Sequence, residues 1–145
     1  MVLRNLFAIA AGLFATMIVA TFLSIAHARF VSPPPSGMDW RDPAAVSAFA
    51  ATMTPGALAL LVVAWVLAAW AGGFVCARLA GSHRSLLGLL IGVLVAAGNA
   101  YGAITVAHPQ WMEACNVGLP PLAAWLGAWL AQRPRNAQNG LASTR

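Results

Sequence analysis

The sequence contains no lysine, only three acidic residues and only two cysteines. Charged residues make up 8% of the chain, whereas they make up about 25% of a typical soluble domain. Disorder is excluded as well, because disordered segments are poor in apolar residues and this chain has a mean hydropathy of +0.78. The composition therefore excludes an ordinary soluble domain and indicates an integral membrane protein.

Long uncharged runs cover most of the chain, and each exceeds the ~18 residues typical of a membrane-spanning helix. A backbone in lipid must pair its own polar groups, so these runs are predicted to be helical. The predicted spans lie near 5–26, 56–79, 85–107 and 110–131. We therefore expect one all-α domain over 1–145, a four-transmembrane-helix bundle with an outer loop at 27–55 and a cytoplasmic tail at 132–145.

The arginines predict the orientation of this bundle. If the N-terminus is cytoplasmic, Arg29 and Arg41 lie outside, close to Asp39 and Asp42. The other six arginines then lie inside, which by the positive-inside rule places both termini in the cytoplasm. They are Arg4, Arg78, Arg84, Arg133, Arg135 and Arg145. The net charge of +5 thus reflects topology, and no nucleic-acid partner is expected.

The first apolar run has a second interpretation. Arg4, the run itself and the small residues around His27 resemble a secretory signal with its cleavage site. Signal-peptide apolar regions are usually about 7–15 residues long, and this one is longer. The length favours a retained helix.

Two pairs of predicted helices resemble each other. Residues 67–70 and 122–125 both read Leu-Ala-Ala-Trp, at an offset of 55. At an offset of 80, Arg4 and Gly12 correspond to Arg84 and Gly92. This pattern predicts a parallel internal repeat, in which two helical hairpins are related by a pseudo-two-fold axis along the membrane normal.

Small residues are expected to mediate the helix contacts, because lipid gives little hydrophobic drive between helices. They recur at four-residue spacing from Ala64 to Ala80, and the glycines at 72, 73, 88, 92, 98 and 102 are likewise assigned to packing. The pair Pro120-Pro121 predicts a kink or a break in the fourth helix. Cys76 and Cys115 are predicted at different depths, too far apart for a disulfide.

The outer loop is predicted to carry a short extracytoplasmic interfacial helix. Asp42 before Pro43 is a typical helix start, and Val46, Phe49 and Met53 follow at helical spacing. Such a helix would anchor the loop at the surface or form a lid over the outer face.

Polar residues near the outer end are the candidates for ligand binding or transport. Asn99 is interpreted either as a hydrogen-bonding contact between helices or as a ligand contact, and Glu113 either as a stabiliser of the helix N-terminus or as a proton or cation site. His27 and His108 form a possible metal pair, although polar helix ends explain them better, and no metal or other cofactor is expected. The full set of candidates is Asn99, His108, Trp111, Glu113, Asn116, Asp39, Trp40 and Arg41.

Three short motifs carry a resemblance to a known class. They are Met53-Thr54-Pro55-Gly56, the Gly72-Gly73 pair with Ala77-Arg78-Leu79-Ala80, and His108-Pro109-Gln110-Trp111. Through them the stretch from 53 to 131 resembles small four-helix bacterial inner-membrane proteins of unassigned role. The resemblance implies a multi-pass protein of the bacterial inner (cytoplasmic) membrane and supplies no catalytic residues.

No nucleophilic triad, paired metal-binding cysteines or nucleotide-binding glycine loop is present in the sequence, so an enzyme is the less favoured class. We expect a non-enzymatic scaffold, assembly partner or small-ligand binder in the lipid bilayer, forming homo-oligomers or binding a membrane partner protein. The alternative is a small transporter or channel with an outer-facing polar site around Asn99 and Glu113.

Overall fold

The computed structural model describes residues 1–133, which form five helices and no strand. The helices are α1 (Val2–Phe30), α2 (Pro43–Thr52), α3 (Pro55–Leu79), α4 (Arg84–Thr105) and α5 (Gln110–Ala131). All except α2 are long and apolar enough to cross a membrane. The prediction of an all-α bundle with four long apolar helices is confirmed, whereas the predicted tail lies outside the described residues from 134 onward.

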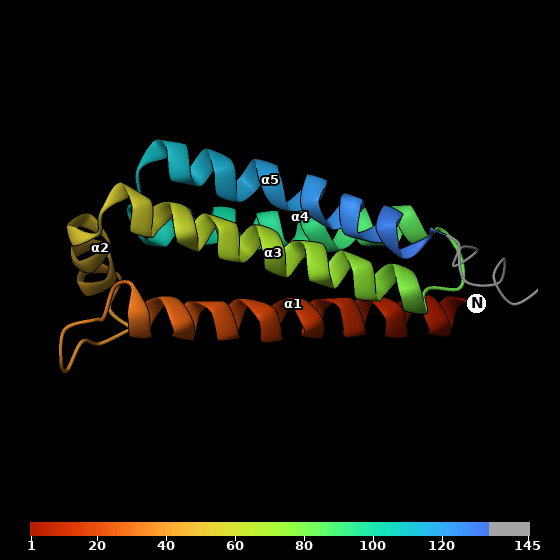
Figure 1. Ribbon diagram of the computed structural model, residues 1–145, viewed down its shortest axis with the longest axis horizontal. Coiled ribbons are helices and arrows are strands. Elements are labelled where there is room, and N and C mark those ends of the chain that lie inside the picture. Colours follow the sequence, from red (N-terminus) through yellow and green to blue (C-terminus); the bar gives the residue numbers. More distant parts are fainter. Residues whose placement is uncertain (134–145) are drawn as a thin grey trace, which may run out of the picture.

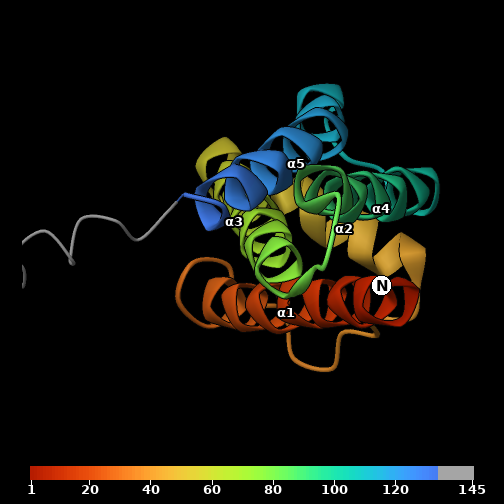
Figure 2. The same cartoon turned by 90° about the vertical axis from the view of Figure 1, so that its right-hand side faces the viewer.

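The four long helices lie side by side, and α2 lies across one end of the bundle (Figure 1). Viewed along the bundle, α1 and α5 lie on opposite sides of α3 and α4 (Figure 2). The central helix is α3, which packs against α1, α4 and α5. By contrast, α1 contacts α4 much less extensively than it contacts α3. The α1–α4 boundary is therefore the loosest one between neighbouring long helices.

Glycines allow α3 to approach α1 and α5 closely. A methyl group added at Gly72 would overlap the side chain of Thr16 on α1, and one added at Gly73 would overlap the backbone of Ala124 on α5. At Gly127 it would overlap the carbonyl of Trp70. These contacts confirm the predicted role of small residues, because only glycine permits the backbones to lie so near.

The halves of the predicted repeat use their corresponding glycines differently. Gly72 and Gly127 correspond at the offset of 55, yet Gly72 faces α1 whereas Gly127 faces α3. At the level of whole helices, α1 pairs with α3 and α4 pairs with α5, as two hairpins would. Residues that correspond in the sequence of the two halves therefore do not make equivalent contacts.

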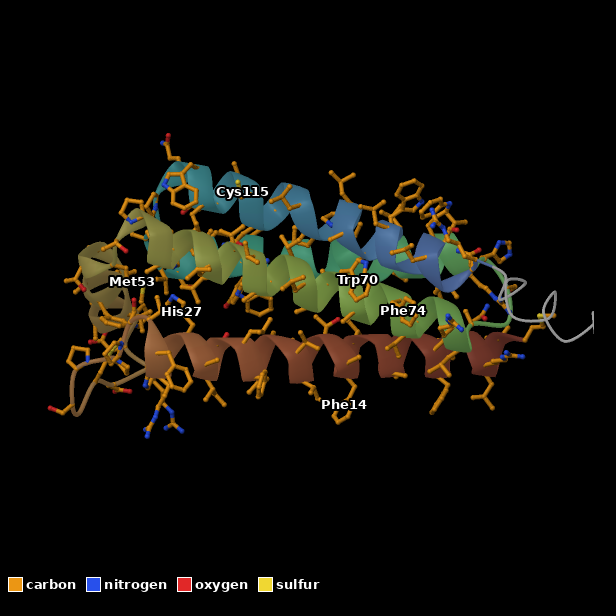
Figure 3. The ribbon with its side chains drawn as sticks, viewed as in Figure 1. Phe14, His27, Met53, Trp70, Phe74 and Cys115 are labelled. Carbon is orange, nitrogen blue, oxygen red and sulfur yellow. The ribbon has the colours of Figure 1, made fainter. Side chains whose placement is uncertain are left out.

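Large apolar side chains cover the outside of the bundle. Phe14 points away from the other helices and is 69% exposed (Figure 3). On α5, Trp125 and Trp129 are exposed on one side, while Ala124 and Gly127 are buried on the other. This inverted pattern, with small residues inside and large apolar ones outside, is what a lipid environment favours.

Hydrogen bonds connect α1 to the α3–α4 turn at the end where the chain begins. Arg4 Nε donates to the Leu79 carbonyl at 3.0 Å, and Asn5 Oδ1 accepts from the Gly81 backbone N–H at 3.0 Å. Asn5 Nδ2 also donates to Ser82 Oγ at 3.0 Å. His83 completes the turn in a left-handed conformation, with φ of 49°. This end of the bundle is thus held by side chains from α1.

The opposite end is organised by two helix caps. Asp42 Oδ1 accepts from the Ala44 N–H at 2.9 Å, and Thr54 Oγ1 accepts from the Ala57 N–H at 3.2 Å. Each cap is followed by a proline at the first helical position, and for α2 this confirms the predicted helix start. Ser47 Oγ accepts from the Ala107 N–H at 3.1 Å and so holds α2 against the α4–α5 loop.

Two details of the predicted helices differ from the structure. The first helix runs from Val2 to Phe30 rather than over 5–26, because nothing in the sequence stops a helix before Pro33. α5 continues through Pro120 and Pro121, so of the predicted kink or break, the break is wrong. Cys76 and Cys115 are both free, as predicted.

Candidate functional site

A cavity of about 490 Å³ lies in the half of the bundle nearest α2, along the loose boundary between α1 and α4. Its volume is within the range of roughly 300–1,000 Å³ found for small-molecule sites. Five polar residues lie on its wall, namely Thr16, Asn99, His108, Glu113 and Asn116. Most of the remaining wall is apolar, including Leu13, Met17, Leu61, Trp65, Leu94, Val95 and Met112.

Two glycines on α4 leave the cavity open. Gly98 and Gly102 line it, and no atom lies within 4 Å of the position that a Cβ would take at either residue. Both glycines were predicted to pack against other helices, and that prediction is wrong. Their missing side chains instead leave unfilled space beside α1.

Polarity changes with depth along the cavity. The wall extends along α4 from Leu94 toward Val106, which at a rise of about 1.5 Å per residue is a length of roughly 18 Å. His108 and Glu113 lie at the end of the cavity nearest α2, where α5 begins, whereas Leu94 and Leu13 lie near the middle of α4 and α1, and Leu94 is partly exposed on the outside of the bundle. The cavity is therefore elongated, with polar residues concentrated at the end nearest α2 and a mostly apolar wall further along.

Asn99 lies where α4 and α5 meet. Its Nδ2 donates to the backbone carbonyl of Asn116 at 2.9 Å. In a regular helix that carbonyl would accept from residue 120, but Pro120 has no N–H. The Asn99 side chain thus supplies the donor that the proline removes, which explains how α5 continues past it. The interpretation of Asn99 as a contact between helices is confirmed by this bond.

Asn116 has a second unusual feature. Its side-chain Oδ1 is buried and has no hydrogen-bond partner within residues 1–133. Leaving a buried polar group unpaired costs about 1–3 kcal/mol, so such groups are uncommon. Asn116 therefore contributes to the cavity wall, but its Oδ1 is covered by neighbouring atoms and pairs with no donor of the described chain.

Glu113 lies in the first turn of α5, where a carboxylate is favoured by the helix dipole. It forms no salt bridge with any residue in the range 1–133. The described wall of the cavity contains no arginine, so Glu113 is its only charged side chain. The carboxylate is thus positioned at a cavity without a protein counter-charge.

His27 and His108 lie in different surroundings. His108 Nδ1 lies 2.9 Å from the Val106 carbonyl, and its ring lines the cavity. His27 is buried between α1 and α3, where Nε2 lies 3.0 Å from the Ala57 carbonyl (Figure 3). No cluster of metal-binding side chains is found among residues 1–133. His27 and His108 therefore do not form a common site.

Four candidates from the sequence lie outside the cavity. Asp39 and Arg41 are exposed, and Asp39 Oδ1 accepts from the Arg41 backbone N–H at 2.9 Å. Trp40 packs edge-on against Phe49, with ring centroids 6.4 Å apart. Trp111 lines a separate hollow beside α2. The structure thus brings together only Asn99, His108, Glu113 and Asn116.

Two wall residues were missed by the sequence analysis. Thr16 is fully buried and its Oγ1 donates to the Gly12 carbonyl at 3.0 Å. Trp65 lies in the middle of α3, although tryptophan in membrane proteins is enriched at the interfaces. Trp70 also lies in the middle of α3 but does not line the cavity, so the position of Trp65 in the sequence did not by itself indicate the cavity.

No protein-family model, curated protein or solved structure matches the chain. The resemblance to small four-helix bacterial inner-membrane proteins stays a prediction. The cavity and the residues on its wall remain as the indication of function.

Proposed function

We propose that the chain is a non-enzymatic, multi-pass membrane protein that binds a single-chain amphiphile from the bilayer in the α1–α4 cavity. The observation that carries this proposal is the cavity itself, which is elongated, apolar in its interior and polar at its outer end. A head group would lie near Glu113 and His108, and an alkyl chain would lie along Leu94, Leu61 and the two open glycines.

The orientation in the membrane is part of the proposal. Arg4, Arg78, Arg84 and Arg133 lie at the end of the bundle where α1 begins, and Arg29 and Arg41 belong to the other end. The positive-inside rule then places the chain start in the cytoplasm and the mouth of the cavity outside. With the resemblance described above, this supports a bacterial inner-membrane location, N-in and C-in.

Binding is favoured over transport because the packing tightens toward the cytoplasmic end. Below the cavity, Ile91 is fully buried in a cluster with Ala8, Cys76 and Ala80. Gly12 and Gly72 lie against each other beside this cluster. A transporter would have to open these backbone contacts in every cycle. Oligomerisation, or a membrane partner protein, remains a prediction.

The test measures equilibrium binding to the protein in nanodiscs of zwitterionic lipid, with empty nanodiscs as the background. The probes are tritiated dodecylamine, dodecanol and dodecanoate, which share one alkyl chain. We expect saturable binding of at least one probe. Gly98→Leu and Gly102→Leu place a side chain in the open space and are expected to weaken this binding about tenfold or more, since they remove the room for several buried methylenes.

Gly118→Leu is the matched control. Gly118 also has no atom within 4 Å of its Cβ position, but it is exposed on α5 and does not line the cavity. All three changes raise helix propensity, so folding should tolerate them. If no probe binds above empty nanodiscs, or if all three variants bind as wild type does, the proposed function is wrong.

A further inference from the structure

We infer that the head group of the bound amphiphile is a cation, an alkylammonium that pairs with Glu113. This inference rests on the proposed function of the cavity and names the chemical class of its ligand. It follows from the charge and the hydrogen-bonding capacity of the outer end of the cavity.

Charge gives the first argument. Glu113 is the only charged side chain on the described wall of the cavity and has no salt bridge within residues 1–133. No arginine, the residue that could form a salt bridge with this carboxylate, lines the cavity. An unpaired carboxylate beside apolar surface is stabilised by a bound cation and destabilised by a bound anion. The charge therefore favours an ammonium over a carboxylate, phosphate or sulfate head.

Hydrogen bonding gives the second argument. His108 Nδ1 lies at the Val106 carbonyl, so a neutral ring carries its proton there and leaves Nε2 as an acceptor. The Glu113 carboxylate also only accepts. An alkylammonium has several N–H donors and no acceptor, which complements this set.

Depth gives the third argument. Glu113 is in the first turn of α5, about 5 Å from the helix start at a rise of about 1.5 Å per residue. Leu94 and Val95 lie on the wall much deeper in the bundle. A cationic head at Glu113 would thus stay near the polar interface, while its chain extends into the apolar part. A compact hydrophilic cation would leave most of the cavity empty.

The test compares dodecylamine with dodecanol in the same nanodiscs of zwitterionic lipid. We expect the wild-type protein to prefer the amine by about tenfold or more, since charged hydrogen bonds are worth about twice neutral ones. Glu113→Gln keeps the size of the side chain and is expected to remove this preference while dodecanol binding persists. Asp39→Asn changes the net charge equally but outside the cavity, and is expected to keep the preference.

A second measurement needs no substitution at Glu113. A diazoacetamide esterifies a protonated carboxyl group with loss of nitrogen and does not couple it to amines, and mass spectrometry of the wild-type protein gives the extent of modification at each acidic residue. Dodecylamine is expected to protect Glu113 at concentrations where dodecanol does not, with Asp39 as the unprotected reference. Equal protection by both probes would contradict the inference.

The outcomes separate this inference from the proposed function. If amine and alcohol bind equally, or if Glu113→Gln keeps the preference for the amine, the cationic head group is wrong and the amphiphile cavity stands. If neither probe binds above empty nanodiscs, the proposed function fails first.

Discussion

Gly73→Ala tests the close contact of α3 with α5, on which the shape of the bundle depends. The added Cβ would lie 2.7 Å from the carbonyl carbon of Ala124, well inside the distance of ordinary contact. The obstructing atoms belong to a helix backbone and cannot move aside as a side chain does. The two helices must therefore separate along their whole contact.

The expected magnitude follows from two opposing effects. Overpacking of a close contact costs about 1–3 kcal/mol, with backbone obstruction at the upper end. Alanine regains up to about 1 kcal/mol of helix propensity over glycine. We therefore expect Gly73→Ala to lower the free energy of unfolding by about 1–2 kcal/mol. At Gly118 no atom lies within 4 Å of the Cβ position. Gly118→Ala should therefore gain helix propensity without overpacking, and its free energy of unfolding should be unchanged or higher.

The assay is reversible unfolding by SDS in dodecylmaltoside micelles, followed by far-ultraviolet circular dichroism. Gly127→Ala obstructs the same helix pair, at the carbonyl of Trp70. Once one substitution has separated the helices, the second should cost less, so the double variant is expected to be less destabilised than the sum of the singles. If Gly73→Ala and Gly118→Ala both have the wild-type free energy of unfolding, the proposed packing is refuted.

Two further predictions follow. Asn99→Leu leaves the Asn116 carbonyl without its donor and should lower the free energy of unfolding by about 1–3 kcal/mol. Pro120→Ala restores a backbone N–H for that carbonyl, so the double variant should recover much of the loss in the same unfolding assay; equal losses with and without Pro120→Ala would contradict this role. For topology, a Ser36→Cys variant should react with a membrane-impermeant maleimide in intact cells, and Ser143→Cys should react only after lysis. The reverse pattern would exclude the cytoplasmic N- and C-termini.

The spans could be predicted from the sequence because their ends coincide with charge and with capping residues. Asp42 and Thr54 each precede a proline, and both act as caps in the structure. The error at α1 arose because apolarity was used to define the ends, whereas a helix continues through polar residues such as His27 until something stops it. Local chemistry thus determined the helices to within a few residues.

The cavity could not be predicted, because it depends on which helix surfaces meet. Gly88 and Gly92 contact α5, whereas Gly98 and Gly102 on the same helix contact nothing. The four glycines look alike in sequence, and the difference arises only because α1 stands away from the outer half of α4. Likewise, the continuity of α5 at Pro120 depends on a side chain from another helix.

The binding of an amphiphile between α1 and α4 can be tested directly by nuclear magnetic resonance. The protein would be placed in deuterated lipid with protonated dodecylamine, and nuclear Overhauser effects from the alkyl chain to leucine methyl groups would be measured. We predict effects to Leu13 and Leu61 on the cavity wall that exceed those to Leu122 and Leu126, which face outward on α5. Effects of equal strength at the outward leucines, or none at the cavity wall, would contradict the proposal.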